Sequence, residues 1–368
     1  MVNNDSLKIK SFLLPISWIY GMVVGIRNLL FDRDILPSES YDKIVISIGN
    51  ITVGGTGKTP HAEYLTSLLK DDFKIAVLSR GYKRKTKGFL FADESSSAKI
   101  IGDEPFQIHS KFKDVIVAVD ADRRNGIKMI LQKYPDTEVI LLDDAFQHRF
   151  VLPNISVLLI DYNRLITDDC LLPAGNLREP AHERQRADIF IVTKCPQDLH
   201  PMEAREISKA LNPRPYQDLF FTYYKYDAFK SVFALSETIS HEQIKMEGYS
   251  LLLVTGIARP EPLMAFLASL SRNVKQITLP DHHFFSANDI QTIVSTFSAI
   301  NSEKKLIVIT EKDAARLIDE SLYPESLKSF TYSLPLHVNF LFEGQPTFNN
   351  KIKSYVSKNQ RNSILSKK

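Results

Sequence analysis

The chain has few cysteines and little net charge. Its 368 residues include two cysteines, Cys170 and Cys195, at a spacing that matches no Cys-x-x-Cys motif. This pattern indicates neither a disulfide framework nor a zinc site, and it favours a reducing, cytosolic compartment. The formal charge of +3 is too small to require nucleic acid, so we expect no nucleic-acid partner.

Low-complexity tracts and short-period repeats are also missing from the sequence. A hydrophobic content of 44% and a charged content of 24% are those of an ordinary globular protein. At roughly 150 residues per domain, the length predicts two or three compact units.

One uncharged stretch, residues 11–26, lies near the N-terminus between Lys10 and Arg27. It contains Pro15 and is shorter than the roughly 20 residues that cross a bilayer. No small-x-small site follows it, which disfavours a cleaved signal peptide. Two interpretations remain: a helix in the membrane interface with Trp18 at headgroup level, or a helix docked on the protein's own core.

Short, continuous apolar runs alternate with helical stretches over the first 215 residues. Continuous runs are typical of strands covered on both faces, and intervening helices imply parallel strands joined by crossovers. We therefore predict a doubly wound α/β sheet with strands at residues 43–49, 74–79, 114–120, 137–144, 155–161 and 187–194.

After Pro215 the sequence becomes rich in aromatic residues with partial alternation, which predicts one or two linker strands. Later buried-type runs, at residues 249–258, 274–280 and 304–314, predict a second, smaller α/β unit. The expected organisation is an N-terminal membrane-associated helical segment at 1–35, a P-loop domain at 36–215, linker strands at 216–235, a C-terminal α/β domain at 236–350 and a frayed basic tail at 351–368.

The stretch GNITVGGTGKTP, residues 49–60, follows the first predicted strand and precedes a predicted helix. The Walker pattern G-x-x-x-x-G-K-[ST] requires a glycine where this chain has Thr52. The alternative to a nucleotide loop is a flexible turn, but the strand and helix on either side favour a phosphate-binding loop. The expected ligands of ATP are Gly54, Gly55, Thr56, Gly57, Lys58 and Thr59, with the Thr59 hydroxyl also on Mg²⁺.

Further carboxylates and histidines follow predicted strands. Asp143 and Asp144 end an apolar strand and resemble a Walker B segment that completes a Mg²⁺ site, although strand ends often carry such residues as turn or N-cap aspartates. Asp103 in GDEP is either a helix N-cap or a base for an alcohol substrate. In VTKCP, Pro196 replaces the aspartate of the guanine motif, which favours ATP over GTP.

Taken together, nine ordered segments resemble the tetraacyldisaccharide 4'-kinases, also called lipid A 4'-kinases. The segments are GNITVGGTGKTP (49–60), SRGYKR (79–84), GDEP (102–105), VAVDADR (117–123), LDDAFQH (142–148), LPAGNLREP (172–180), TGIARP (255–260), DHHFF (281–285) and TEKDA (310–314). The family's own loop is of the GNxxxGGxGKTP type, which explains Thr52. Two departures, Ala145 after the paired aspartates and Asn176 within the LPAGNLRE segment, affect local loop shape.

The resemblance implies a membrane-associated kinase of Gram-negative lipid A biosynthesis. It would transfer the γ-phosphoryl group of ATP to the 4'-hydroxyl of a tetraacylated glucosamine disaccharide 1-phosphate and form lipid IVA. By the same resemblance, Asp103 is the catalytic base and His282 assists it across an interdomain cleft, with His283 as the alternative histidine. The residues that match substrate-side motif positions are Arg80, Tyr82, Arg123, Gln147, His148 and Arg178.

A lipid substrate also favours the interfacial interpretation of the N-terminal helix, with the basic YKRKTK segment facing anionic groups. We expect a monomer on the cytoplasmic face of the inner membrane, peripheral or monotopic. Two other functions stay open: a nucleotide-hydrolysing switch or metal chaperone, for which the guanine motif is missing, and a soluble kinase of a small metabolite, which the apolar N-terminus disfavours.

Overall fold

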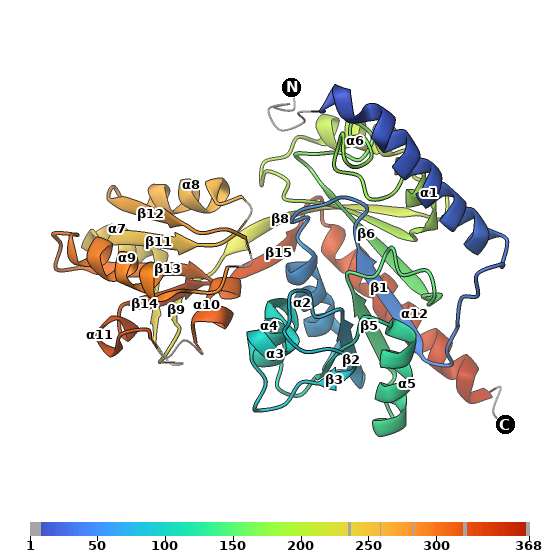
Figure 1. The fold of residues 1–368 in the computed structure, drawn as a ribbon, viewed down its shortest axis with the longest axis horizontal. Coiled ribbons are helices and arrows are strands. Elements are labelled where there is room, and N and C mark those ends of the chain that lie inside the picture. The colour runs from blue at the N-terminus through green and yellow to red at the C-terminus, as the bar shows by residue number, and fades with distance from the viewer. Residues whose placement is uncertain (1–8, 235–236, 258, 282, 319–321, 366–368) are drawn as a thin grey trace.

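Two sheets with helices on both faces form two units that lie next to each other in the computed structural model (Figure 1). The structure describes residues 9–234, 237–257, 259–281, 283–318 and 322–365, with side chains up to residue 359. The two-unit α/β architecture is the predicted one.

The first sheet has the strand order β15-β8-β7-β6-β1-β5-β2-β4-β3 and is parallel from β8 to β4. All six strands predicted for the first unit are present. The strands are β1 (Ile44–Gly49), β2 (Ile75–Ser79), β3 (Leu90–Phe91), β4 (Ile116–Val119), β5 (Val139–Asp143), β6 (Ile155–Asp161), β7 (Ile189–Thr193), β8 (Asp218–Tyr226) and β15 (Leu336–Phe340).

Helices cover both faces of this sheet because successive side chains of each strand point to opposite faces. Ile44, Ile46 and Ile48 of β1 pack with α2 (Lys58–Leu69), α4 (Asp103–Lys111) and α12 (Gly344–Leu365). Val45 belongs to the core on the other face, which α5 (Arg123–Lys133) covers. On that face, α6 (Pro201–Leu211) packs on β6 and β7. The remaining short helices of this unit are α3 (Ala98–Ile101) and η2 (Ala181–Arg186).

The second sheet has the order β10-β9-β14-β13-β11-β12. Its strands are β9 (Phe229–Ser231), β10 (Thr238–Ile239), β11 (Ser250–Thr255), β12 (Val274–Thr278), β13 (Lys305–Thr310) and β14 (Thr331–Leu334). Its helices are α7 (His241–Glu247), α8 (Glu261–Leu270), α9 (Ala287–Ser298), α10 (Glu311–Leu317) and α11 (Glu325–Lys328). Residues of α7 and α8 pack on one face of the sheet and residues of α9, α10 and α11 on the other.

Two antiparallel strands join the units. The sequence predicts linker strands only where the chain passes from the first unit to the second, at residues 216–235. β8 leaves the first sheet, and β15 returns from β14 to pair with β8 along its length. β15 therefore belongs to the first sheet, although it falls within the predicted C-terminal domain at 236–350. Its Phe340 packs against Phe220 of β8 and Phe348 of α12.

The predicted frayed tail at 351–368 is instead helical up to Leu365, because α12 packs on the first sheet. Phe348, Ile352 and Val356 recur every four residues and are buried in the same core as β1. Asn350 and Ser354, which lie between them in the sequence, are exposed. An amphipathic pattern therefore runs through a segment whose overall composition is polar.

The N-terminal segment forms η1 (Ser11–Leu13) and α1 (Leu14–Asp32), which runs along the first unit (Figure 1). One side of α1 is hydrogen-bonded to loops of that unit. The bonds run from Ser17 Oγ to Leu171 O (3.0 Å), from Tyr20 Oη to Arg178 O (2.8 Å) and from Arg27 Nη2 to Gln147 O (2.8 Å). The helix is thus docked through polar groups.

The other side of α1 is apolar and uncovered, with Trp18 73% exposed. The further exposed apolar residues are Phe12, Ile16, Ile19, Met22, Val23, Ile26 and Leu29. The helix extends beyond the uncharged stretch 11–26: its 22 residues from Ser11 to Asp32 are enough, by length and composition alone, to cross a membrane, with a mean hydropathy of 1.4 over 18 of them. In this structure, the polar bonds keep the helix against the first unit.

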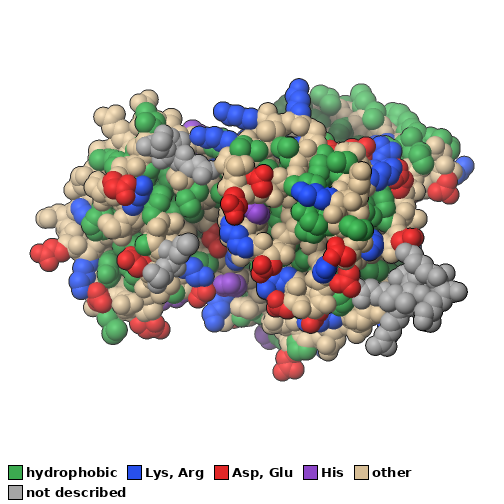
Figure 2. Space-filling model, turned by 90° about the horizontal axis from the view of Figure 1, so that it is seen from below, with side chains coloured by type: hydrophobic (Ala, Val, Ile, Leu, Met, Phe, Trp, Pro, Cys, Tyr) green, Lys and Arg blue, Asp and Glu red, His purple; other side chains and the backbone are tan. Residues whose placement is uncertain are grey.

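On the face drawn in Figure 2, acidic and basic side chains are interspersed. This distribution agrees with the small net charge of the chain.

Candidate nucleotide and substrate site

The glycine-rich loop lies between β1 and α2, as its sequence predicts. Gly57 is the N-cap of α2 with a φ of 87°, and Gly54 has a φ of 97°, so both need the left-handed conformation that glycine adopts at no steric cost. Backbone N–H groups at such a helix start bind phosphate oxygens. Gly57 also has no room for a side chain, since an added Cβ would lie 1.8 Å from Tyr224 Oη.

The missing first glycine has a structural reason. Thr52 forms an antiparallel bridge with Leu177, and the backbone bonds on either side run from Arg178 N to Ile51 O (2.8 Å) and from Val53 N to Asn176 O (2.8 Å). The start of the loop is therefore extended and paired with the LPAGNLREP segment. An extended residue needs no glycine.

Polar side chains at the ends of β6 and β7 hold the rest of the loop. Thr193 Oγ1 donates to Thr56 O (2.9 Å), Lys194 Nζ donates to Gly55 O, and the same Nζ lies 2.7 Å from Asp161 Oδ2. In the sequence, Lys194 enters only through the comparison with the guanine motif, and Asp161 is not among the predicted site residues. One sequence feature could have indicated both residues: each is a charged residue at or just after the end of a buried strand, and one of these strands lies next to the strand that carries the loop.

His61, in the first turn of α2, is buried between the loop and β8. Its Nδ1 lies 2.8 Å from Gly57 O and its Nε2 lies 3.0 Å from Thr222 Oγ1. Because a carbonyl oxygen only accepts, Nδ1 carries the proton and Nε2 accepts from the Thr222 hydroxyl. Burial lowers the pKa of His61 to about 4, so the ring is neutral at pH 7.

The paired carboxylates stand at the end of β5, beside the loop. Asp144 has a φ of 47°, and its Oδ1 lies 3.7 Å from both Lys58 Nζ and Arg178 Nη1. Asp143 is buried, and among the described residues its Oδ1 has no hydrogen-bond partner. Burial, together with the carboxylates of Glu104 and Asp144, raises the pKa of Asp143 to about 7. An unpartnered carboxylate oxygen beside the P-loop lysine fits a divalent cation.

Within the described ranges, no group of three or more His, Cys, Asp and Glu side chains is arranged to hold a metal ion. The predicted Mg²⁺ ligands, the two aspartates and the Thr59 hydroxyl on the second residue of α2, stay a prediction, and together they would make only a partial ligand set. Such a set is typical of sites in which nucleotide phosphates supply the other Mg²⁺ ligands.

A cavity of about 320 Å³ opens next to Asp144. It brings together four of the six predicted substrate-side residues, Arg80, Tyr82, Gln147 and Arg178. Sequence reasoning did not predict that α1 would line the same cavity. The other lining residues are Tyr20, Val24, Arg27, Ser79, Glu104, Asp144 and Glu179.

The other two predicted substrate-side residues, Arg123 and His148, lie behind this cavity. Arg123 is buried, its guanidinium donates to the backbone oxygens of Asp120 and Asp143 (3.0 Å each), and burial lowers its pKa to about 10. His148 Nε2 accepts from Arg123 N (3.2 Å), and burial beside Arg123 lowers its pKa to about 4. In this structure both residues support the loop that carries the paired aspartates.

Asp103 is the first residue of α4, and Gly102 occupies the N-cap position, so the N-cap alternative for Asp103 is wrong. Its carboxylate is buried and pairs with Arg316 of α10, in the second unit. Its neighbour Glu104 lines the cavity. Asp103 therefore lies where the two units meet, one residue from the cavity wall.

The DHHFF segment of the second unit approaches the same region. Lys312 Nζ lies 3.7 Å from Asp281 Oδ1, and Lys83 Nζ lies 3.5 Å from Asp281 O. His282 falls outside the described residues. His283 Nε2 lies 2.7 Å from Asp289 Oδ2 in the first turn of α9, which assigns His283 a capping contact.

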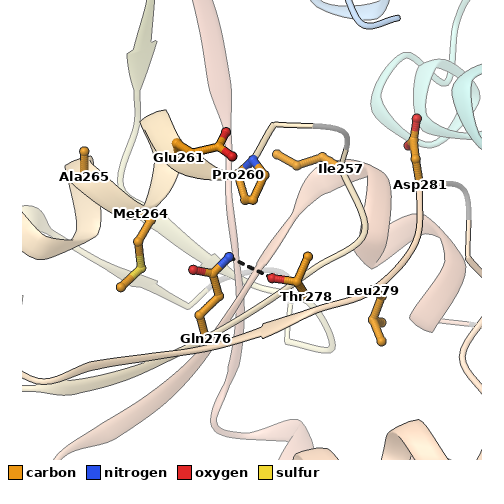
Figure 3. Close-up of a pocket in the computed structure, with 9 residues that line it drawn as sticks. All are labelled: Ile257, Pro260, Glu261, Met264, Ala265, Gln276, Thr278, Leu279 and Asp281. Carbon is orange, nitrogen blue, oxygen red and sulfur yellow. Dashed lines mark hydrogen bonds between the residues drawn. The ribbon is translucent and has the colours of Figure 1, made fainter. Parts of the chain in front are cut away.

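A larger hollow of about 780 Å³ lies on the second unit between α8 and β12 (Figure 3). Most of the residues that line it are apolar or uncharged. Its two ionisable residues are Glu261 and Asp281. Gln276 and Thr278 hydrogen-bond to each other at 2.9 Å (Figure 3). Because its two ionisable residues are acidic, this hollow is unsuited to phosphate.

Comparison with known proteins gives a consistent result. The family profile described as tetraacyldisaccharide-1-P 4'-kinase matches residues 9–357. The chain is 49% identical to the tetraacyldisaccharide 4'-kinase of Phocaeicola vulgatus, covering 99% of this chain and 100% of the relative. It is 44% identical to the protein of the same name from Flavobacterium johnsoniae, covering 95% and 98%.

Among solved structures, the chain resembles LpxK from Aquifex aeolicus, crystallised in complex with ATP. The two are 29% identical, with a TM-score of 0.72, and the match covers 95% of this chain and 98% of the other. The similarity therefore extends over both units.

Proposed function

Since the chain belongs to the tetraacyldisaccharide-1-P 4'-kinase family, we propose that it transfers the γ-phosphoryl group of ATP to the 4'-hydroxyl of a tetraacylated glucosamine disaccharide 1-phosphate. The product is lipid IVA, an intermediate of lipid A biosynthesis. One observation carries the proposal: a single cavity joins the carboxylate beside the P-loop lysine, three arginines and the apolar N-terminal helix.

The phosphate side of the reaction belongs to the loop and its neighbours. The backbone from Gly54 to Gly57 binds the ATP phosphates at the start of α2, and Lys58 neutralises their charge. Thr59, Asp143 and Asp144 would hold Mg²⁺, which would supply charge stabilisation at the transferred group. The Oδ1 of Asp143, which has no hydrogen-bond partner within the described part of the chain, supports this ligand set.

The acceptor side belongs to the cavity. Three guanidinium groups, those of Arg27, Arg80 and Arg178, suit an anionic sugar phosphate because arginine donates paired hydrogen bonds to phosphate oxygens. Tyr82 and Gln147 add hydroxyl and amide groups that can orient the sugar. Arg123 and His148 act from behind, by holding the aspartate loop.

Asp103 accepts the proton of the 4'-hydroxyl, and His282 assists it from the second unit. The position of Asp103 supports this assignment, because it precedes the cavity residue Glu104 and lies where the two units meet. Closure of the two units, through the paired strands β8 and β15, brings the acceptor in line with the γ-phosphate.

The enzyme acts as a monomer on the cytoplasmic face of the inner membrane, where α1 lies in the interface and nucleic acid has no part. A substrate with four acyl chains stays in the bilayer with its sugars at headgroup level. The exposed apolar side of α1 faces the acyl region, and its other side lines the cavity at Tyr20, Val24 and Arg27.

The test is transfer of labelled phosphate from ATP to the disaccharide 1-phosphate lipid in detergent micelles with Mg²⁺. We expect a labelled lipid product and a loss of at least 100-fold in kcat for Lys58→Ala. Folded, ATP-binding protein that gives no labelled lipid would refute the function. Wild-type turnover by Asp103→Ala or His282→Ala would remove that residue from the mechanism.

Unchanged activity and solubility after deletion of residues 1–30 would favour the small-metabolite alternative, because the deletion removes the exposed apolar side of α1 together with the cavity residues Tyr20, Val24 and Arg27. Trp18→Ser leaves the cavity lining intact, so loss of turnover of vesicle-bound lipid in that variant favours an enzyme that works at the membrane surface.

A further inference from the structure

The second unit reaches Asp103 through α10, which packs against α3 and α4 of the first unit (Figure 1). Arg316 of α10 has no exposed side-chain surface (0%) and its Nη2 pairs with Asp103 Oδ2. Its Nη1 donates to Asp313 Oδ1 at 3.1 Å. One guanidinium therefore joins a carboxylate of each unit inside the interface.

Asp313 is itself firmly held by the second sheet. It accepts from Thr255 Oγ1 (3.0 Å), Thr310 Oγ1 (2.7 Å) and Gly256 N (3.2 Å). A continuous set of bonds thus runs from the end of β11 through Asp313 and Arg316 to Asp103. This set fixes the direction from which the guanidinium meets the Asp103 carboxylate.

Lys312, one turn earlier on α10, adds a second cation. Its Nζ lies 3.8 Å from Asp103 Oδ2, 3.7 Å from Glu104 Oε1 and 3.7 Å from Asp281 Oδ1. Among the described residues, the charged groups near Asp103 include Arg316 and Lys312 on α10 and Glu104 on its own helix, with Asp313 and Asp281 behind the two cations. α10 contacts both Asp103 and the residue that precedes His282.

We propose that Arg316 is a positioning residue for Asp103: it keeps the carboxylate ionised and oriented for the acceptor hydroxyl, so the base is correctly set only when the second unit is in place. This inference rests on the proposed kinase function. The proposed role of Arg316 differs from that of an ion pair that only holds the two units together. A buried guanidinium favours the charged form of a carboxylate and restricts its rotation.

The same interface supplies a matched control. Lys111 of α4 bonds to Glu63 (2.7 Å) and to Glu311 of α10 (3.2 Å), so this group also crosses between the units. Glu311→Gln removes one interface ion pair without touching Asp103. This variant therefore shows how kcat changes when the interface is weakened and the surroundings of Asp103 are not.

The experiment measures kcat for lipid phosphorylation against pH for wild type, Arg316→Gln, Arg316→Lys and Glu311→Gln. We expect Arg316→Gln to lower kcat at least tenfold, leave ATP affinity within twofold, and move the acid limb of the profile about one pH unit higher. Arg316→Lys restores the charge but not the paired geometry, so its acid limb stays close to the wild-type position while kcat remains reduced.

A double substitution tests whether Arg316 acts through Asp103. Asp103→Asn/Arg316→Gln should turn over at the rate of Asp103→Asn alone, since Arg316 has no base left to position. Additive losses, a wild-type rate in Arg316→Gln, or a pH profile equal to that of Glu311→Gln would each overturn the inference.

Two controls show whether a low rate comes from a failure of the proposed function, of the inference or of folding. Absence of wild-type lipid turnover would refute the proposed function, whereas wild-type turnover with an unimpaired Arg316→Gln refutes the inference alone. If thermal unfolding shows that Arg316→Gln does not fold, Arg316→Lys decides the matter: wild-type kcat in that variant overturns the inference, and reduced kcat at an unchanged acid limb supports it.

Discussion

The exposed side chain of Trp18 predicts that the protein binds to a membrane surface. It stands on the uncovered side of α1 with 73% of its surface exposed. An aromatic side chain presents roughly 200 Å², so the exposed part of Trp18 is about 150 Å². At ~25 cal/mol per Å², complete transfer from water would contribute roughly 4 kcal/mol.

An interfacial helix immerses its apolar side only partly, which leaves about 2 kcal/mol for Trp18, or about a 30-fold change in partitioning. Trp18→Ser should therefore weaken binding to lipid vesicles by about 10- to 30-fold, measured by co-sedimentation at several lipid concentrations. The fold should be unaffected, because the polar bonds that dock α1 come from other residues.

Met246 offers a matched control, since it is 80% exposed but lies on α7 of the second unit. Met246→Ser should bind vesicles as the wild type does. Equal co-sedimentation of Trp18→Ser and wild type would refute the reasoning that the apolar side of α1 enters the membrane.

Three further predictions concern stability, measured as the free energy of unfolding in denaturant. Gly57→Ala should lower it by about 1–3 kcal/mol, because the new methyl group meets the Tyr224 hydroxyl and the φ of 87° disfavours alanine. The buried, neutral His61 has its pKa lowered to about 4, so the unfolded chain binds a proton below about pH 6.5 that the folded chain does not. Stability should fall as the pH drops from about 6.5 to 4, by at most about 1.4 kcal/mol per pH unit from His61, and His61→Gln should flatten this slope. Ile352→Ala should cost about 2–4 kcal/mol, because Ile352 is buried under the first sheet, whereas Lys353→Ala should cost less than about 1 kcal/mol.

Each of these predictions has a result that contradicts it. The double variant Gly57→Ala/Tyr224→Phe should recover part of the loss, and no recovery would mean that the hydroxyl is not the obstacle. An unchanged slope between pH 6.5 and 4 in His61→Gln would mean that other groups cause the loss, such as His148, whose pKa is also lowered to about 4. Equal losses for Ile352→Ala and Lys353→Ala would show that α12 does not pack as described.

Sequence reasoning was strongest where the signal is local. Strands covered on both faces appear as continuous apolar runs, and all six predicted in the first unit are present. The glycine-rich loop before a helix and the aspartates after a strand place their groups at one edge of a parallel sheet. Lys58 and Asp144 accordingly lie side by side, with 3.7 Å between Nζ and Oδ1.

It was weakest where residues far apart in the chain meet. The polar composition of residues 351–368 concealed an amphipathic period that becomes evident only once α12 lies on the first sheet. The return strand β15 is recognisable only by its pairing with β8, more than 100 residues earlier. Composition averages over a segment, whereas packing depends on which side of a helix or strand faces a partner.

The amino-acid sequence by itself determined the α/β class, the phosphate loop and the apolar N-terminal helix, because each depends on neighbouring residues or a short period. Tertiary structure alone decided that Thr52 can replace a loop glycine by pairing with Leu177, that α1 lines the cavity with its inner side, and that Arg316 meets Asp103 across the units. These contacts join residues separated by more than 100 positions. No local pattern specifies such contacts, because they exist only after the sheets and helices have packed.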